Sequence, residues 1–361
     1  METCVNPNGE DGICVALPTC PQLQKKFTIS KTLPAEEDKF LKNYKCSNNV
    51  KVDVCCTPND QLNDTQRLVK KLETNLIPRP PDCGMELSNR IVGGDETNYD
   101  EHLWTVALQY NKMRGQTGFH CGGAIINDRY VLTAAHCVDK IPARWSLRSV
   151  RIGDWNLETK SDCDLNDPTE CLPPPVDVTV EEKIVHPSYN STKLSSPYDI
   201  ALLRLSEKID FSNLVKPICL PFEPALWTKD YTGKFFVATG WGLTETGKAS
   251  PVKLKVKLPF VTNETCNDVF SANNMIIRDS QICAGAERDC TPNELKMFNF
   301  YLQPKMHGGP LLSKNLNDPL GYWYLSGLVS YGAIQCGTAG IPGVYSRTAS
   351  FLEWILDNMK K

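Results

Sequence analysis

The sequence predicts an all-β fold of paired barrels, preceded by a small module that disulfides hold together. From residue 91 onward, short β-branched and aromatic runs alternate with turn residues, a pattern typical of β-barrels. Long helical patterns are scarce in the same stretch. The chain also contains 16 cysteines among its 361 residues, and a count that is both high and even is typical of an oxidised, extracellular framework.

The expected strands follow one another along the larger part of the chain. They lie at 104–110, 122–126, 130–133, 150–152, 201–205, 235–238 and 324–330. The tail, 350–361, departs from this pattern because its apolar residues share one helical face: Phe351, Trp354, Ile355 and Met359. Two lysines at its end suit the negative pole of a helix dipole. We therefore expect a final helix there.

Composition gives no sign of binding to nucleic acid or to a membrane. A net charge of −3 gives no reason to expect binding to nucleic acid or to an anionic membrane. No apolar run approaches the roughly eighteen residues that span a bilayer. No signal peptide precedes Cys4, which conflicts with the cysteines, so we expect a secreted protein whose true N-terminus is missing. Glycosylation sequons at Asn63, Asn190 and Asn263 agree with secretion, although such triplets also occur by chance.

Residues 4–56 form the small module. It contains six cysteines and is too short to bury a sufficient core, so three bridges would be its main constraint. Six cysteines allow fifteen connectivities. The adjacent pair that closes the module resembles the arthropod clip domain, which mediates protein–protein contacts; an unrelated disulfide module is the alternative. The resemblance implies the pairs Cys4–Cys55, Cys14–Cys46 and Cys20–Cys56.

Residues 57–90 form a polar connector. A proline-rich stretch at 78–81 favours an extended, semi-rigid chain, and apolar residues between 62 and 76 fit a short helix. The connector ends at Arg90, which Ile91-Val92-Gly93-Gly94 follows. This resembles the activation site of a trypsin-like zymogen, where cleavage after Arg90 makes Ile91 a new N-terminus. The alternative is a loop that merely contains an arginine.

Residues 91–361 resemble the chymotrypsin-like serine proteases of trypsin type. Three motifs carry this resemblance: Thr133-Ala134-Ala135-His136-Cys137, Asp199-Ile200-Ala201-Leu202-Leu203, and the block from Cys283 to Leu312 with its Gly308-Gly309-Pro310. The resemblance implies a chymotrypsin-like double β-barrel with a C-terminal helix. Acyl transfer by a hydroxyl needs a base and a carboxylate that orients the base. His136 matches the base and Asp199 the carboxylate, whereas a lone histidine or aspartate would usually be structural.

The nucleophile of the family is absent. Alignment from Gly308 places His307 where the family has its serine, and loss of that serine costs a subtilisin-type protease roughly a million-fold in turnover. Met306 stands where the family has the aspartate that pairs with the new N-terminus. Removing one partner of a buried ion pair costs about 3–5 kcal/mol. Lys305 replaces a glycine of the oxyanion hole. We therefore expect no activity even after cleavage at Arg90.

The primary specificity pocket is only partly of trypsin type. Gly332 and Gly343 lie in segments that resemble the pocket walls, and both would leave room for a long side chain. Trypsin-like members place an aspartate two residues before the cysteine that matches Cys290. Arg288 holds that position and Asp289 comes one residue late, so specificity for basic residues is a hypothesis.

The other ten cysteines can all be paired. The resemblance implies Cys83–Cys219, Cys121–Cys137, Cys266–Cys283 and Cys290–Cys336, and Cys163–Cys171 would close a small loop, as in some clip proteases. Near that loop, Asp154 and Asn156, with Asp162 and Asp164, supply oxygens that calcium would accept. Solvated loop charge is the favoured explanation of these residues, with calcium as the alternative, and no other cofactor is expected.

The spacing before Gly308 is unusual. Seventeen residues separate Cys290 from Gly308, where the family has four. The run 300–303 can be encoded by a pyrimidine-rich sequence ending in CAG, as at the 3′ end of an intron. We hypothesise that 291–307 contains an error in the gene model, although removing thirteen residues does not restore the aspartate and serine.

The sequence thus predicts a secreted clip-domain serine protease homologue that lacks peptidase activity and binds as a cofactor or regulator in an immune cascade such as melanisation. The expected partners are an upstream protease that cuts after Arg90 and other cascade proteases or prophenoloxidase-type zymogens. One alternative is an active trypsin-like endopeptidase whose correct sequence contains Gly-Asp-Ser. A purely structural disulfide protein is the other, but it leaves His136, Asp199 and Arg90 without a common explanation.

Overall fold

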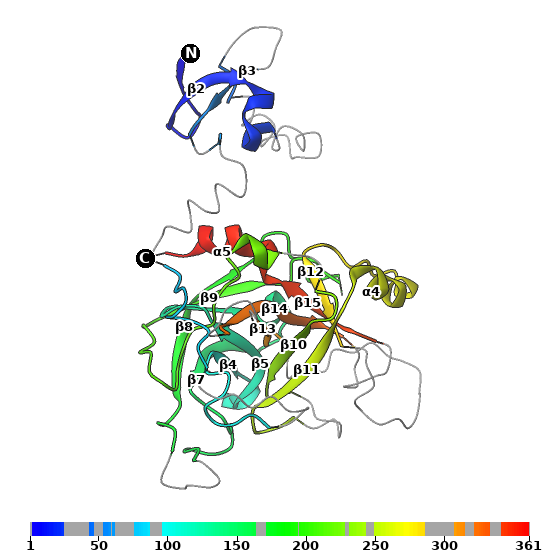
Figure 1. The fold of residues 1–361 in the computed structure, drawn as a ribbon. Helices are drawn as coiled ribbons and strands as arrows, with labels where there is room; N and C mark the ends of the chain where they lie inside the picture. Colours follow the sequence, from blue (N-terminus) through cyan, green and yellow to red (C-terminus); the bar gives the residue numbers. More distant parts are fainter. Residues whose placement is uncertain are drawn as a thin grey trace. The chain divides into compact units, whose positions relative to one another are not determined.

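The computed structural model describes the chain in two compact units, Met1–Asn75 and Leu76–Lys361 (Figure 1). Within them it describes residues 2–24, 43–46, 53–58, 60–61, 76–86, 96–163, 171–193, 195–227, 231–242, 249–285, 307–314, 321–332 and 341–360. The short helix expected between 62 and 76 lies almost entirely outside these residues.

The smaller unit is a three-stranded antiparallel sheet. Its strands are β1 (Thr3–Val5), β2 (Asp11–Ala16) and β3 (Asp53–Cys56), in that order across the sheet. Three disulfides, Cys4–Cys55, Cys14–Cys46 and Cys20–Cys56, join it. The buried residues beneath the sheet are few: Cys20, Leu23, Tyr44, Val54 and Cys56. With so small a core, the bridges are the main constraint on the chain.

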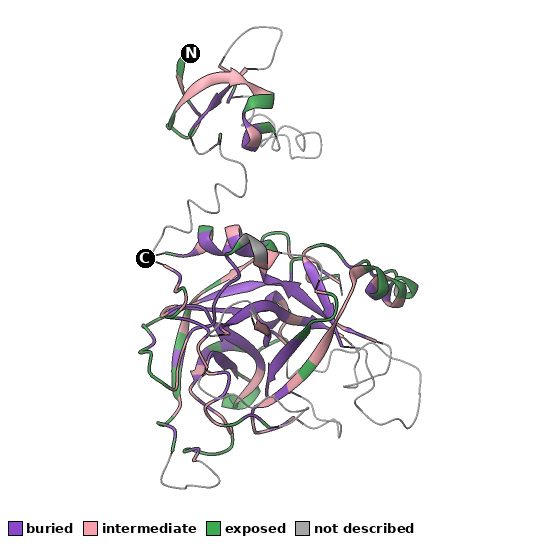
Figure 2. Cartoon of the chain, in the orientation of Figure 1, coloured by how far each residue is buried: buried purple, intermediate pink, exposed green. Residues whose placement is uncertain are grey.

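The larger unit begins with a closed barrel. Its strands run in the order β4 (Thr105–Asn111), β5 (Thr117–Ile125), β6 (Tyr130–Thr133), β9 (Ala201–Leu205), β8 (Val176–Val185) and β7 (Ser146–Ile152). Strand β4 is buried along six of its seven residues. Figure 2 shows the buried strands of the barrels in purple.

A second closed barrel follows. Its strands run in the order β10 (Phe235–Gly240), β11 (Leu254–Val261), β12 (Gln281–Ala284), β15 (Gly343–Arg347), β14 (Trp323–Tyr331) and β13 (Pro310–Lys314). Among the described residues, two α-helices accompany it: α4 (Asn263–Phe270), whose N-cap is Thr262, and α5 (Leu352–Asn358) near the C-terminus. The predicted all-β fold of paired barrels with a final helix is confirmed.

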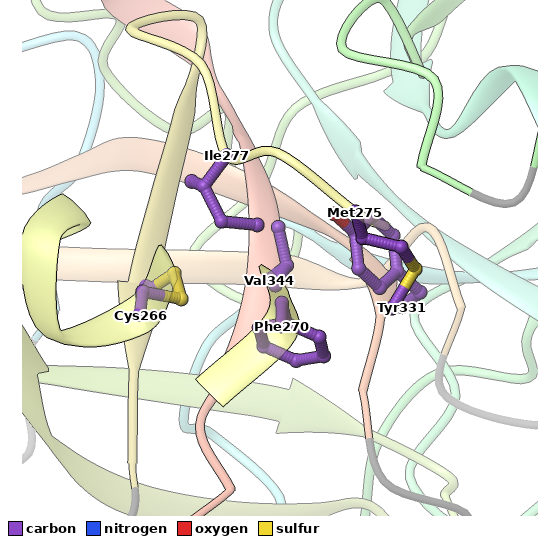
Figure 3. Packing of buried hydrophobic residues seen from close by; sticks show 7 residues of the cluster. Cys266, Phe270, Met275, Ile277, Tyr331 and Val344 are labelled. Carbon is purple, nitrogen blue, oxygen red and sulfur yellow. A yellow bond between two sulfur atoms is a disulfide. The ribbon is translucent and has the colours of Figure 1, made fainter. Parts of the chain in front are cut away.

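Helix α4 packs beside strand β12 of the second barrel. The disulfide Cys266–Cys283 ties it to β12, and the ring of Phe270 lies edge-on to that of Tyr331, with centroids 5.8 Å apart. Figure 3 shows Phe270 and Val344 within this buried cluster. The cluster supports the end of β14, next to residues that line the candidate site.

Strand β8 is among those that the sequence analysis did not predict. It has one buried residue among ten, but six of the ten are β-branched, so its sequence carries a strand signal. Among the residues that the structure describes, no helix has the length and apolar character that a bilayer-spanning segment needs.

Candidate catalytic site

His136 lies where strand β6 ends. It belongs to a short 3₁₀ turn, Ala135–Cys137, that begins two residues after the buried Thr133. The disulfide Cys121–Cys137 ties this turn to β5, and Tyr110 Oη donates a 2.9 Å hydrogen bond to the carbonyl of Cys137. The backbone around His136 is therefore held on three sides, which fixes the direction of its side chain.

Asp199 lies against His136, just ahead of strand β9. Its Oδ2 is 2.8 Å from His136 Nδ1, and its Oδ1 accepts a 3.0 Å hydrogen bond from the backbone N–H of His136. Ser330 Oγ also donates to Asp199 Oδ2. Burial alone would raise the pKa of Asp199, but the charge of His136 and these hydrogen bonds outweigh it, so the pKa lies below its ordinary value. An ionised Asp199 fixes the hydrogen of His136 on Nδ1.

His307 faces His136 from the other barrel. The two rings are nearly perpendicular, at 88°, with centroids 4.8 Å apart. His307 Nδ1 lies 3.0 Å from the carbonyl oxygen of Ser330. The His307 carbonyl accepts a 2.9 Å bond from the N–H of Gly122. The residue aligned with the family's serine is thus fixed between β5 and β14, beside the candidate base.

Gly308 explains why His307 lies there. Its φ is +76°, a conformation that favours glycine. A Cβ on Gly308 would lie 2.7 Å from the carbonyl oxygen of Gly122 and would collide with Thr133 Oγ1. Only glycine therefore allows the chain to turn against β5 and carry His307 toward His136.

The arrangement has a base and its orienting carboxylate but lacks a proton donor to the base. His136 Nε2 is buried, and among the described residues it has no hydrogen-bond partner. In a serine protease triad a hydroxyl donates to this nitrogen. Here the neighbouring side chain is an imidazole whose Nδ1 faces the Ser330 carbonyl. The described geometry can orient an imidazole, but it has no activated hydroxyl.

Two of the predicted pocket residues are described. The structure brings Gly332 and Gly343 together, because a Cβ on Gly332 would lie 3.4 Å from the Cα of Gly343. Arg288 and Asp289 lie outside the described residues, as do Met306, Lys305 and both residues of the expected cleavage site, Arg90 and Ile91.

Among the described residues, four disulfides join the larger unit. They are Cys83–Cys219, Cys121–Cys137, Cys163–Cys171 and Cys266–Cys283, and each of these pairs was expected from the sequence. Cys290 and Cys336 lie outside the described residues. So does Asn63. Asn190 is exposed, and its Oδ1 accepts a hydrogen bond from Thr192 Oγ1. Asn263 is half-buried at the start of α4.

Most of the oxygens expected to bind calcium already accept hydrogen bonds within the protein. Asp162 Oδ2 accepts from the N–H groups of Trp155 and Asn156, and Asn156 Oδ1 accepts from the N–H of Glu158. Asp154 Oδ1 is buried without a hydrogen-bond partner among the described residues. Calcium takes six to eight oxygens, so Asp154 supplies one suitable oxygen and the calcium site remains a prediction.

Two features of the structure escaped the sequence analysis. Ser330, two residues before Gly332, contacts both Asp199 and His307. Glu86 accepts hydrogen bonds from the N–H of His102, at 2.8 Å, and from Trp323 Nε1, at 2.6 Å. Burial raises the pKa of Glu86 and lowers that of His102 well below its ordinary value. No local pattern marks Glu86, because its partner on β14 is 237 residues away.

Comparison with known proteins agrees with this arrangement. The family model described as Trypsin matches residues 91–293, and the one described as the regulatory CLIP domain of proteinases matches residues 4–56. CLIP domain-containing serine protease B4 of Anopheles gambiae is 36% identical over 99% of this chain and 92% of that protein. Melanization protease 1 of Drosophila melanogaster is 34% identical over 99% of this chain and 93% of that protein.

A solved structure is similar along nearly the whole chain. It is that of the Drosophila Grass clip serine protease of the Toll pathway, with a TM-score of 0.67 and 29% identity over 99% of this chain and 97% of that one. Both parts of the predicted resemblance are therefore confirmed. The chain has two closed barrels and a disulfide-bonded N-terminal sheet, and it matches clip-domain serine proteases along nearly its whole length. It therefore belongs to the clip-domain serine protease family.

Proposed function

We propose that this chain is a secreted clip-domain serine protease homologue without peptidase activity, which acts by binding in an extracellular proteolytic cascade. The observation that carries the proposal is the pairing of His136 with His307. The base is oriented by Asp199, yet its Nε2 has no hydrogen-bond partner among the described residues. Without a hydroxyl at that nitrogen, the acylation step has no nucleophile.

The expected loss of turnover is large. Removing the serine from a triad costs roughly a million-fold in turnover, and the remaining acceleration comes from oxyanion donors and substrate binding. The sequence adds a second defect, since Met306 offers no charge to the N-terminus that cleavage after Arg90 would create. Cleavage would then change the covalent chain without ordering the oxyanion hole and the specificity pocket.

A role in binding is consistent with what the chain retains. The clip region, at 4–56, and the two barrels, within 91–361, are both present, and the sequence predicts a connector at 57–90. One relative is named a melanization protease and a structural neighbour belongs to the Toll pathway. We infer an immune cascade for this chain. Its partners would be an upstream protease that cuts after Arg90 and other cascade proteases or prophenoloxidase-type zymogens.

An active trypsin-like endopeptidase is the second candidate. The seventeen residues between Cys290 and Gly308 favour it, because they stand where the family has four and could replace a lost Gly-Asp-Ser. In that case the natural protein would differ from the present sequence within 291–307. Sequencing the transcript across residues 284–312 decides between the two, and a message that encodes 291–307 as written removes the second candidate.

The direct test uses protein of this sequence, cut after Arg90. A fluorophosphonate probe reacts with activated serine nucleophiles, so we expect no labelling and no turnover of an arginyl amide substrate. The control is the same protein with His136→Ala. Turnover by the unchanged protein that His136→Ala abolishes would overturn the proposal.

A further inference from the structure

The segment 76–86 precedes the expected cleavage site at Arg90, yet it is built into the larger unit. Asn127 Nδ2, for example, donates a 2.8 Å hydrogen bond to the carbonyl of Leu76. Cleavage would therefore divide the larger unit between a short chain that ends at Arg90 and a long chain that begins at the next residue. The contacts of this segment with the barrels decide whether the two chains stay together.

One disulfide and two backbone hydrogen bonds fix the end of the segment. Cys83 is bonded to Cys219. The N–H of Gly84 donates to the carbonyl of Pro217, and the carbonyl of Gly84 accepts from the N–H of Trp323, both at 2.9 Å. Gly84 has φ +63°, and a Cβ there would collide with the carbonyl of Trp323. Because glycine permits this close approach, the segment lies against the first residue of strand β14.

The side chain of Glu86 is buried against residues of the long chain. It is 6% exposed, and its two oxygens accept from different donors. Oε1 accepts from the backbone N–H of His102 at 2.8 Å, and Oε2 accepts from Trp323 Nε1 at 2.6 Å. Hydrogen bonds to a carboxylate are stronger than those between neutral groups. Both donors belong to the long chain, so the long chain holds a carboxylate of the short chain by both of its oxygens.

Two lysines of the long chain complement the charge of Glu86. Burial raises the pKa of Glu86, and the charge of Lys314 opposes that shift. Burial lowers the pKa of Lys253 to about 8, and the charge of Glu86 comes first among those that oppose this second shift. Removing one partner of a buried charge pair is destabilising, because it leaves the other charge uncompensated. Withdrawal of Glu86 would also leave the N–H groups of His102 and Trp323 without their acceptor.

We propose that Glu86 holds the short chain on the barrels of the long chain after cleavage, independently of the disulfide Cys83–Cys219. The inference rests on the proposed cleavage after Arg90. The clip region, at 4–56, belongs to the short chain, so Glu86 keeps the clip region and the substituted site in one molecule. A protein that acts by binding through both parts depends on this attachment.

The experiment removes the disulfide and then cuts the full chain at one defined bond. Cys83→Ala with Cys219→Ala leaves only non-covalent contacts between the two chains. A site for factor Xa is made by three substitutions just ahead of Arg90: Leu87→Ile, Ser88→Glu and Asn89→Gly. Size-exclusion chromatography should show the two chains of the cut protein in one peak, and dilution gives their dissociation constant. Because factor Xa makes the cut, the result does not depend on a natural activating protease.

Matched variants in this background test the carboxylate itself. Glu86→Ala should raise the dissociation constant at least about tenfold. Trp323→Phe, which keeps an aromatic ring and removes the Nε1 donor, should also raise it. Asp82→Ala is the control, because it removes an exposed carboxylate from the same segment, and it should leave the dissociation constant unchanged. Equal constants for Glu86→Ala and Asp82→Ala would overturn the proposal, as would separation of the two chains when Glu86 is present.

A measurement on protein with its natural cysteines and the factor Xa site covers the case in which a variant does not fold. Hydrogen exchange, read by mass spectrometry, compares the uncut and the cut protein. The N–H groups of Gly84, His102 and Trp323 all donate between the two chains, so they should stay protected after cutting. Loss of this protection would overturn the proposal. Peptide hydrolysis is assayed in the same samples, and its appearance would contradict the proposed function while leaving the result on Glu86 intact.

Discussion

The imidazole rings of His136 and His307 lie at 88° to each other with centroids 4.8 Å apart. Each ring comes from a different barrel, and each is oriented through its Nδ1 by a separate acceptor. This pair replaces the contact between a base and a hydroxyl on which serine proteases depend. The described site therefore holds an oriented imidazole beside a second imidazole, and loss of peptidase activity is the proposed consequence.

Replacing His307 by serine should not restore full activity. The variant returns a hydroxyl near His136 Nε2, but Met306 still gives the new N-terminus no charged partner, and loss of such a partner costs about 3–5 kcal/mol. We expect His307→Ser, cut after Arg90, to remain at least about a hundred-fold less active on an arginyl amide than His307→Ser with Met306→Asp. Equal rates for the single and double variants would show that the ion pair is not needed.

Gly308→Ala should destabilise the larger unit strongly. The residue has φ +76°, and a Cβ there meets Gly122 and Thr133. We expect a loss of about 3 kcal/mol or more in the free energy of unfolding. Gly115→Ala is the control, because its φ is +74° but nothing lies within 4 Å of the added carbon, so it should cost only about 1 kcal/mol. Urea denaturation compares them, and similar losses would exclude a steric role for Gly308.

Ser330→Ala should cost more stability than another serine on the same strand. Its hydroxyl donates to the carboxylate of Asp199, and hydrogen bonds to charged groups contribute about 1.5–3 kcal/mol against about 0.5–1.5 kcal/mol for neutral pairs. Ser326 is the control, since its hydroxyl donates to the hydroxyl of Ser313. Thermal unfolding of both alanine variants measures the difference. A smaller loss for Ser330→Ala would mean that the contact with Asp199 is weak.

Asp154 should make the protein less stable as pH rises from about 4 to 6. Burial, with the charge of Asp162 in second place, raises the pKa of Asp154 to about 6. The folded state therefore binds a proton that the unfolded state has already lost in this window, and stability falls as pH rises through it. Asp154→Asn should remove this decrease in the free energy of unfolding between pH 4 and 6. It should also raise the free energy of unfolding at pH 7 by about 1–2 kcal/mol.

The same residue tests the calcium prediction. If Asp154 ligates Ca²⁺, adding the ion at pH 7.5 should raise the melting temperature of the unchanged protein and leave Asp154→Asn unaffected. At pH 5, where Asp154 is protonated, the rise should be much smaller. A Ca²⁺ effect that persists in the variant would place the ion elsewhere.

Local patterns were enough to predict the architecture. The predicted ranges matched β4, β6 and β9 closely, because these strands are buried along most of their length. Strand β8 was not predicted, although six of its ten residues are β-branched. Short motifs around His136 and Asp199 predicted the base and its orienting carboxylate, and alignment from Gly308-Gly309-Pro310 placed His307 at the position of the family's serine.

The sequence by itself determined which chemical groups this protein possesses, including an imidazole where a hydroxyl is expected. Only the tertiary structure decided how those groups meet. Ser330 reaches Asp199 across 131 residues of chain, and Trp323 reaches Glu86 across 237. The perpendicular pair of His136 and His307 depends on the packing of Gly308 against Gly122. Such contacts leave no local pattern, because they arise only when two closed barrels bring distant strands within hydrogen-bonding range.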